Sequence, residues 1–282
     1  MGLKWQDAVD FTFSTRKSWK GKESKSPGIN TRHFAEFMGE DFVCEEITRK
    51  VLRSFAEHLE DTERSDGTIN RHLSSVRTVL DHCVCEEELD MNLPVIPRRK
   101  EYQGRPFFFT KDQVDTIVRN ENRIGLGDLV RFASLSGARM GELLKLQVRD
   151  IDKDAGLIYI GGRPNFNTKT GDWRTVPIHK NLMPMLEDRT NGIPEDVCIF
   201  GDQWIDGRQV LRKFKQVVRD TGYESHFVFH CLRHSFATWA IEDGVPLRVL
   251  MDLMGHKKIE TTLRYAKVTD TGRRQAIDCL AV

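Results

Sequence analysis

Side chains that can bind or attack a phosphate are concentrated between residues 229 and 267: His230, Arg233, His256 and Tyr265. His230 and Arg233 are three residues apart, so in a helix they share one face and can reach a single anionic ligand. Pro246 and Gly255 predict that the stretch is broken into short helices, so the chain can fold back on itself. His256 and Tyr265 would then approach the same ligand, and the grouping predicts phosphate chemistry.

A further arginine with a nearby carboxylate follows a glycine-containing corner earlier in the chain. Arg139 comes two residues after Gly137 and lies in the first turn of a helix that we expect to run to Leu146. Glu142 is three residues further on and lies on the same side of that helix. The pair also fits an ordinary surface ion pair, which contributes little stability.

Between residues 149 and 178 the apolar period changes from 3.6 to 2, which predicts strands. We expect three short strands, at 148–151, 157–160 and 173–178, in a small antiparallel meander within an otherwise helical domain. Lys169 lies in the second turn, from which its ammonium group could reach a ligand. A turn lysine that is simply solvated fits the sequence as well.

Residues 3–92 have the apolar spacing of several amphipathic helices. The fourth, expected from residue 68 to about 88, has small polar and basic residues on neighbouring turns: Asn70, Arg71, Ser74 and Arg77. Such side chains on an exposed face suit contacts to DNA phosphates and base edges. An ordinary solvated helix face is the alternative.

The basic, proline-bounded segment 97–106 lacks apolar periodicity and predicts a linker. We therefore expect a helical domain at 1–96 and a second domain at 107–282. The second domain opens with Thr110, and Gln113 three residues on matches a capping box at the start of a helix.

Composition limits the classes of function. The net charge of +1 gives no bulk attraction to a polyanion, so DNA binding would need local basic patches. The six cysteines have neither a disulfide framework nor paired zinc spacing, which indicates reduced thiols and no metal. No secretion signal or apolar span is present, so we expect no membrane association and a cytoplasmic protein in a bacterial cell.

Taken together and in this order, the motifs resemble those of the tyrosine recombinases, the phage-integrase family. SGARMGELLKL resembles the first-arginine motif, HCLRHSFATWAIEDGV the His-x-x-Arg motif, and LMGHKKIETTLRYAKV the segment with the second histidine and the nucleophilic tyrosine. The resemblance implies a mainly α fold with a small β-meander (α+β), arranged as a two-domain, C-shaped DNA clamp. The helical first part resembles the core-binding domain of the family, and we expect no counterpart of the arm-binding domain of larger phage integrases.

The resemblance also implies a reaction. Tyr265 would attack a DNA phosphodiester and form a 3′-phosphotyrosyl bond without metal, cofactor or ATP. Arg139 and Arg233 would stabilise the charge on the phosphate. Lys169 would protonate the departing 5′ oxygen as general acid. His230 would assist proton transfer at the tyrosine, His256 would hydrogen-bond the phosphate, and Glu142 would orient Arg139 or His230.

Partners follow from the same resemblance: double-stranded DNA recombination sites, a homotetramer in the synaptic complex, and an accessory DNA-bending or directionality protein. Integration or excision of a phage or other mobile element is the expected role. A Xer-type resolvase of chromosome or plasmid dimers stays open. A type IB topoisomerase is disfavoured by the small size and helical first domain. A non-catalytic DNA-binding module would lack a catalytic residue, and none is missing.

Overall fold

A computed structural model gives the fold and describes residues 2–39, 41–101, 107–120, 125–163, 166, 173–201, 204 and 206–266. The chain divides into two compact units, Met1–Gly104 and Arg105–Val282. Each unit has its own hydrophobic core. Within the described ranges, no helix is both long and apolar enough to cross a membrane.

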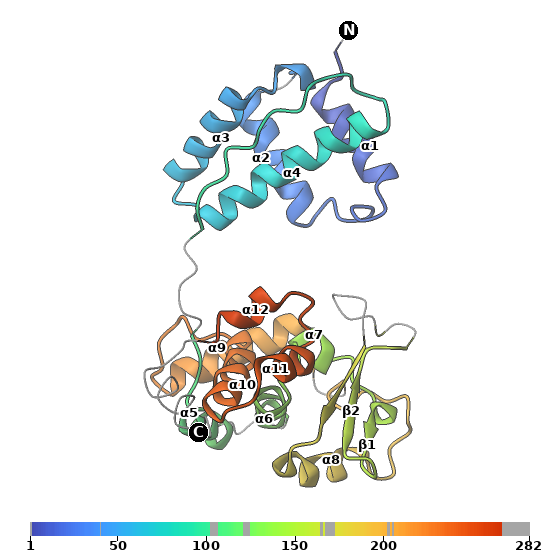
Figure 1. The fold of residues 1–282 in the computed structure, drawn as a ribbon, viewed down its shortest axis with the longest axis vertical. Helices are drawn as coiled ribbons and strands as arrows, with labels where there is room; N and C mark the ends of the chain where they lie inside the picture. Colours follow the sequence, from blue (N-terminus) through green and yellow to red (C-terminus); the bar gives the residue numbers. More distant parts are fainter. Residues whose placement is uncertain are drawn as a thin grey trace, which may run out of the picture. The chain divides into compact units, whose positions relative to one another are not determined.

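The described part of the first unit is helical: α1 (Trp5–Thr15), α2 (Ser26–Met38), η1 (Cys44–Glu46), α3 (Arg49–Asp61) and α4 (Asp66–Cys85). Thr48 caps the start of α3, because its hydroxyl accepts a hydrogen bond from the Val51 N–H. Phe34 and Phe55 meet edge to face in the core, with ring centroids 4.9 Å apart. α4 packs against α1, α2 and α3 (Figure 1), so one core holds the four helices together.

The chain after α4 runs back along that helix. The amide of Asn70 donates to the carbonyl of Arg99 and accepts from its N–H, both at 2.9 Å, and Arg77 donates to the carbonyl of Pro94 at 2.9 Å. An asparagine side chain offers one donor group and one acceptor, which suits an extended backbone. The first residues of the predicted linker are therefore attached to the first unit. Residues 102–106 of that linker lie outside the described residues.

This attachment contradicts the exposed polar face predicted on α4. Asn70 is only 6% exposed, and its amide is occupied by the segment that follows the helix. The Ser74 hydroxyl donates to the carbonyl of Asn70 within the helix. Of the four residues predicted to face DNA, Arg71 is the one that is exposed. Helical periodicity cannot show that a later, irregular segment covers a polar stripe.

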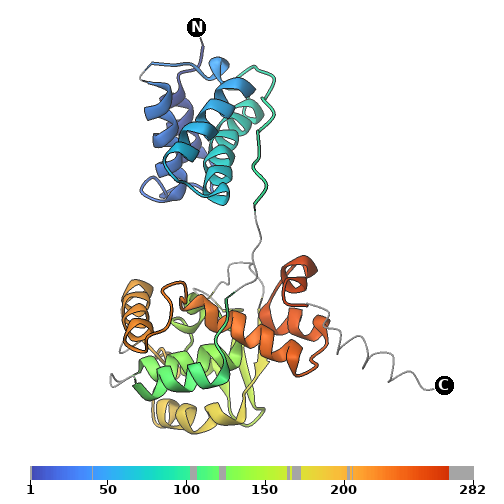
Figure 2. The same ribbon diagram turned by 90° about the vertical axis from the view of Figure 1, so that its left-hand side faces the viewer.

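The second unit contains α5 (Lys111–Asn120), α6 (Leu126–Ser136), α7 (Met140–Leu143), η2 (Val148–Asp150), η3 (Lys180–Leu182), α8 (Met183–Thr190), α9 (Gly207–Asp220), α10 (His230–Glu242), α11 (Leu247–Met254) and α12 (Ile259–Leu263). The predicted capping box before α5 is present: Thr110 N–H donates to Gln113 Oε1, and Gln113 N–H donates to Thr110 Oγ1. The predicted breaks separate α10, α11 and α12, and α12 lies beside α11 (Figure 2).

A three-stranded antiparallel sheet confirms the predicted meander, in the order β1 (Ile151–Asp152), β2 (Leu157–Ile160) and β3 (Arg174–Pro177). Ile158 faces Val176 across the β2–β3 pair. The first strand is shorter than expected because Val148–Asp150 forms a 3-10 turn, closed by the Asp150 carboxylate, which accepts from the Gln147 N–H. α11 packs against β3 and α10 packs against α6, so helices and sheet bring distant residues together.

Candidate active site

Arg233 is buried at the centre of the second unit and ties three segments together. It lies in the first turn of α10 and is 3% exposed. Its Nη1 donates to the carbonyl of Gly137 and its Nη2 to that of Met254, the last residue of α11. Burial, followed by repulsion from Arg139 and Arg174, lowers the pKa of Arg233 to about 9. Two carbonyl oxygens thus hold the guanidinium group of Arg233 in place, and its positive charge is not fully compensated.

Gly137 makes this corner possible. It ends α6 in the left-handed region, with φ +62°, which favours glycine. A Cβ on Gly137 would lie 2.5 Å from a ring carbon of Phe236 on α10, so a larger residue does not fit. The corner therefore brings the carbonyl of Gly137 onto Arg233 and places Arg139 just before α7.

Glu142 is the carboxylate that organises the arginines. Its Oε1 accepts from Arg139 Nη1 at 2.9 Å, while its Oε2 accepts from the Arg139 backbone N–H at 2.8 Å. Arg174, at the start of β3, donates to both carboxylate oxygens, at 3.2 and 2.8 Å, and its Nε donates to the carbonyl of Leu253. The fork of Arg174 therefore links the sheet, α7 and α11 through one ion-pair network.

The charges in this network do not balance. Burial raises the pKa of Glu142, but the hydrogen bond and charge of Arg174, together with Arg139, outweigh burial and lower that pKa to about 2. One carboxylate thus contacts two guanidinium groups, and the charge of Arg233 acts on both of them. The excess positive charge makes this place suited to an anion. Among the side chains of Arg139, Glu142 and Arg174, that of Arg139 is the most accessible, with 24% of it exposed.

His256 lies at the edge of the same cluster. It follows Gly255, which ends α11 in the left-handed region with φ +63°, and its Nδ1 is 2.9 Å from Thr262 Oγ1. Burial, followed by the charges of Arg233 and Arg139, lowers the pKa of His256 to about 4. A neutral imidazole beside the arginines can donate one hydrogen bond to an anion without adding charge.

Tyr265 lies just after α12 and turns its phenol toward α10. Its ring packs on a small apolar cluster that includes Ala237 and Leu250, and its hydroxyl is 2.5 Å from Nδ1 of His234. Burial raises the pKa of Tyr265, although the charge of Arg233 opposes that rise. The phenol is therefore protonated in this state and is within electrostatic range of the arginine cluster.

Five predicted site residues are thus brought together from separate segments: Arg139, Glu142, Arg233, His256 and Tyr265. His230 stands beside them, with its ring edge to face with that of His234 and ring centroids 4.8 Å apart. Lys169 lies outside the described residues.

Sequence reasoning missed Arg174 and His234, although each had a signal. In β3, Arg174 and Val176 lie on the same face because strand side chains alternate, and Val176 is 2% exposed. An arginine on that inward face needs a carboxylate. His234 is four residues after His230, so both project from one side of α10.

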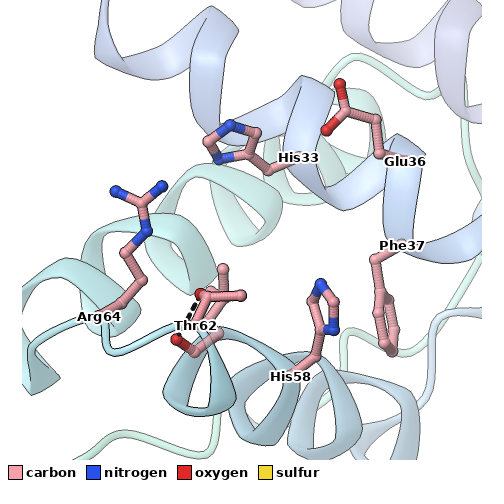
Figure 3. Close-up of a pocket in the computed structure, with 7 residues that line it drawn as sticks. His33, Glu36, Phe37, His58, Thr62 and Arg64 are labelled. Atoms are coloured by element: carbon pink, nitrogen blue, oxygen red, sulfur yellow. Dashed lines mark hydrogen bonds between the residues drawn. The ribbon is translucent and has the colours of Figure 1, made fainter.

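A second group of polar side chains surrounds a pocket of about 500 Å³ in the first unit. Figure 3 shows His33 and Glu36 of α2 on one side, with His58 of α3 and Arg64 of the following loop on the other. His33 Nδ1 is 3.0 Å from His72 Nε2. Because burial lowers the pKa of His72 and its Nδ1 bonds the Thr68 carbonyl, His72 accepts from His33. Nε2 of His33 is left out of this chain of bonds.

Within the part of the chain that the structure describes, no group of three or more His, Cys, Asp or Glu side chains is placed to hold a metal ion.

Residues 108–271 match the model of the phage integrase family, and residues 16–97 match that of the phage integrase SAM-like domain. Tyrosine recombinase XerC of Natranaerobius thermophilus is 28% identical over 237 residues, which cover 79% of each chain. Tyrosine recombinase XerC of Pelobacter propionicus is 29% identical over 255 residues, which cover 84% of this chain and 82% of that one.

Two solved structures share the fold. The integrase of transposon Tn1549 (residues 82–397) in complex with a circular intermediate DNA aligns with a TM-score of 0.80 at 15% identity, covering 99% of this chain and all of that one. A lambda integrase (75–356) dimer bound to a COC′ core site aligns with a TM-score of 0.74 at 19% identity, covering 93% of this chain and 94% of that one.

Proposed function

The chain belongs to the phage integrase family of site-specific tyrosine recombinases, and we propose that Tyr265 is the nucleophile with which it cleaves and rejoins DNA. The observation that carries this proposal is a pair of guanidinium groups on one carboxylate next to the buried Arg233, within electrostatic range of a buried phenol. This site has the charge to bind a phosphodiester and the group to attack it.

The arginines lower the barrier to attack. A phosphodiester already carries a negative charge and gains more in the pentacoordinate transition state, so fixed donors act most strongly there. Arg139 offers the accessible guanidinium, and Arg233 supplies a buried charge held in place by two carbonyl oxygens. Arg174 and Glu142 hold Arg139 in position, and His256 donates a hydrogen bond to the phosphate.

The products conserve the energy of the broken bond. Attack by the phenol replaces one phosphodiester by another, and the free 5′-hydroxyl can reverse the reaction. Lys169 supplies the proton for the departing 5′ oxygen in this proposal, because a lysine in the turn that the sequence predicts can approach from the groove side of DNA. The reaction then needs neither ATP nor a metal ion.

Replacement of the nucleophile tests the proposal directly. We expect Tyr265→Phe to bind DNA with unchanged affinity and to form no covalent adduct on a nicked suicide substrate, because the phenyl ring keeps the packing and lacks the oxygen. The wild-type chain run with excess chelator is the control and should still form adducts. Adducts in the Phe variant, or their loss with chelator, would contradict the mechanism.

For the biological role, we propose recombination of the ends of a mobile element in a bacterial cytoplasm, by four copies of the chain on two DNA duplexes. The similarity to XerC chains over about four-fifths of the sequence favours a second candidate, resolution of chromosome dimers. Sequencing the DNA captured covalently in host cells separates them: element ends support the first role and one chromosomal site the second. Mass photometry with and without that DNA tests the tetramer.

For the first unit, we propose that the pocket beside Arg64 contacts the DNA backbone, in place of the covered face of α4. Arg64 and His58 line one hollow, and each has an N–H group that can donate a hydrogen bond to a phosphate oxygen. Arg71, the exposed member of the α4 set, lies close by in sequence.

The measurement is DNA affinity against salt concentration. We expect Arg64→Ala to weaken binding uniformly across sequences and to reduce the salt slope by about 1, as for loss of one phosphate contact. Arg53→Ala, which removes the same charge from an exposed position on α3 away from the pocket, is the control. Equal effects of the two substitutions would contradict a local contact.

A further inference from the structure

The phenol of Tyr265 is paired with a different histidine from the one that sequence motifs indicate. Its oxygen is 2.5 Å from Nδ1 of His234, whose ring meets that of His230, the first residue of the His-x-x-Arg motif, edge to face with ring centroids 4.8 Å apart. His234 is part-buried and comes directly after Arg233 in α10. The contact joins the proposed nucleophile to the helix that also supplies a phosphate-binding arginine.

We propose that His234 is a catalytic residue, which accepts the phenolic proton of Tyr265 during strand cleavage and returns it during rejoining. This inference rests on the proposed function, in which Tyr265 is the nucleophile. As the bond from Tyr265 Oη to phosphorus forms, the proton on Oη passes to Nδ1 of His234. The bond from phosphorus to the 5′ oxygen breaks, and that oxygen takes its proton from the general acid on the other side.

The environment of His234 explains how the step depends on DNA. Burial, then the neighbouring His230 and the charges of Arg264 and Arg233, lowers the pKa of His234 to about 4. Its imidazole is therefore neutral near pH 7 and has a lone pair for the proton of Tyr265. In that state transfer is uphill, because the pKa of the phenol is raised by burial.

A bound phosphate changes this balance. Its negative charge offsets the arginines that disfavour a proton on His234, so the basicity of the imidazole rises when substrate arrives. The same arginines stabilise the phosphate and lower the cost of forming the phenolate. The phenol is thus held protonated without DNA and becomes a nucleophile when a scissile phosphate occupies the cluster.

Substitutions that separate proton transfer from positioning test the role of His234. Glutamine can hydrogen-bond the phenol but cannot take its proton. We expect His234→Gln and His234→Ala to slow single-turnover adduct formation to a similar extent, by roughly 10²–10⁴-fold. DNA affinity and circular dichroism, measured on both variants, confirm that the fold persists. Restoration of the wild-type rate by glutamine would overturn proton transfer, as would an alanine variant within threefold of wild type.

A substrate with sulfur in place of the bridging 5′ oxygen identifies the side of the reaction on which His234 acts. A thiolate leaves without a proton, so this substrate should restore cleavage by Lys169→Ala and should not restore His234→Gln. Rescue of His234→Gln by the sulfur substrate would place His234 on the leaving-group side and overturn the inference.

A nucleophile with a lower pKa provides a complementary test. Replacement of Tyr265 by 3,5-difluorotyrosine lowers the pKa of the phenol, so it should recover most of the rate lost in His234→Gln and little of that lost in His230→Gln. The reverse pattern would assign the proton to His230. Failure of the proposed function is seen separately, because Tyr265→Phe would then still form adducts.

Discussion

At the scale of single residues, Glu142 decides whether the arginine cluster exists. Its carboxylate accepts from Arg139 and Arg174, and 5% of the residue is exposed. Removal of one partner of a buried ion pair costs about 3–5 kcal/mol, because the remaining charges lose their compensation. Without the Glu142 carboxylate, two guanidinium groups would lose their compensating charge, and both lie next to the buried Arg233.

We therefore expect Glu142→Gln to lower the free energy of unfolding by roughly 3 kcal/mol and to reduce strand cleavage sharply. Urea denaturation at several pH values checks the electrostatic origin. The pKa of Glu142 is about 2 in the fold against 4.5 for the free group, so its contribution is complete above pH 4.5 and is lost toward pH 2. The gap between wild type and variant should narrow by about 1.4 kcal/mol per pH unit in that window. A gap independent of pH would contradict this account.

The site residues that could be predicted are those whose types match motifs in order along the chain. Arg139, Arg233, His256 and Tyr265 were predicted from spacing and resemblance, and the structure brings them together. Their catalytic roles stay predictions. Arg174 was missed because its ion pair depends on the inward face of a strand and on a carboxylate 32 residues away in the sequence. Such a pairing is set by tertiary packing, which periodicity does not encode.

At the scale of elements, the corner between α6 and α7 fixes the arrangement of the arginines. Gly137 combines a left-handed backbone, contact with Phe236 and a carbonyl that accepts from Arg233. Helix breaks and capping boxes were predictable from local sequence, as Gly255 and Thr110 show. The segment bound to Asn70 was not, because that side chain to backbone contact joins residues 29 apart in sequence.

We expect Gly137→Ala to lower the free energy of unfolding by about 2–4 kcal/mol, combining left-handed strain with overpacking against Phe236. Gly192→Ala is the matched control, since Gly192 has φ +71° and no atom within 4 Å of the added Cβ. It should cost only the strain, about 1–2 kcal/mol. The difference between the two melting curves isolates the packing term. Equal losses would show that Phe236 moves aside and that the corner tolerates a side chain.

At the scale of the whole molecule, the chain divides its tasks between two units with separate cores. All the site residues described in the arginine cluster belong to the second unit, and the Arg64 pocket belongs to the first. Because the net charge is only +1, neither affinity nor steering can come from bulk charge, so DNA binding must come from local contacts.

Expression of the second unit alone tests how DNA binding and cleavage are divided between the two units. We expect Arg105–Val282, expressed alone, to unfold cooperatively, because its aromatic and aliphatic core is complete without the first unit. It should still form the Tyr265 adduct on a suicide substrate, at a rate near wild type once DNA is saturating, but with affinity weaker by at least tenfold, since the contacts of the first unit are lost. The Arg64→Ala substitution in the intact chain should reproduce part of that loss and leave the saturated rate unchanged. A folded second unit that binds DNA but forms no adduct at any concentration would mean that the first unit completes the active site.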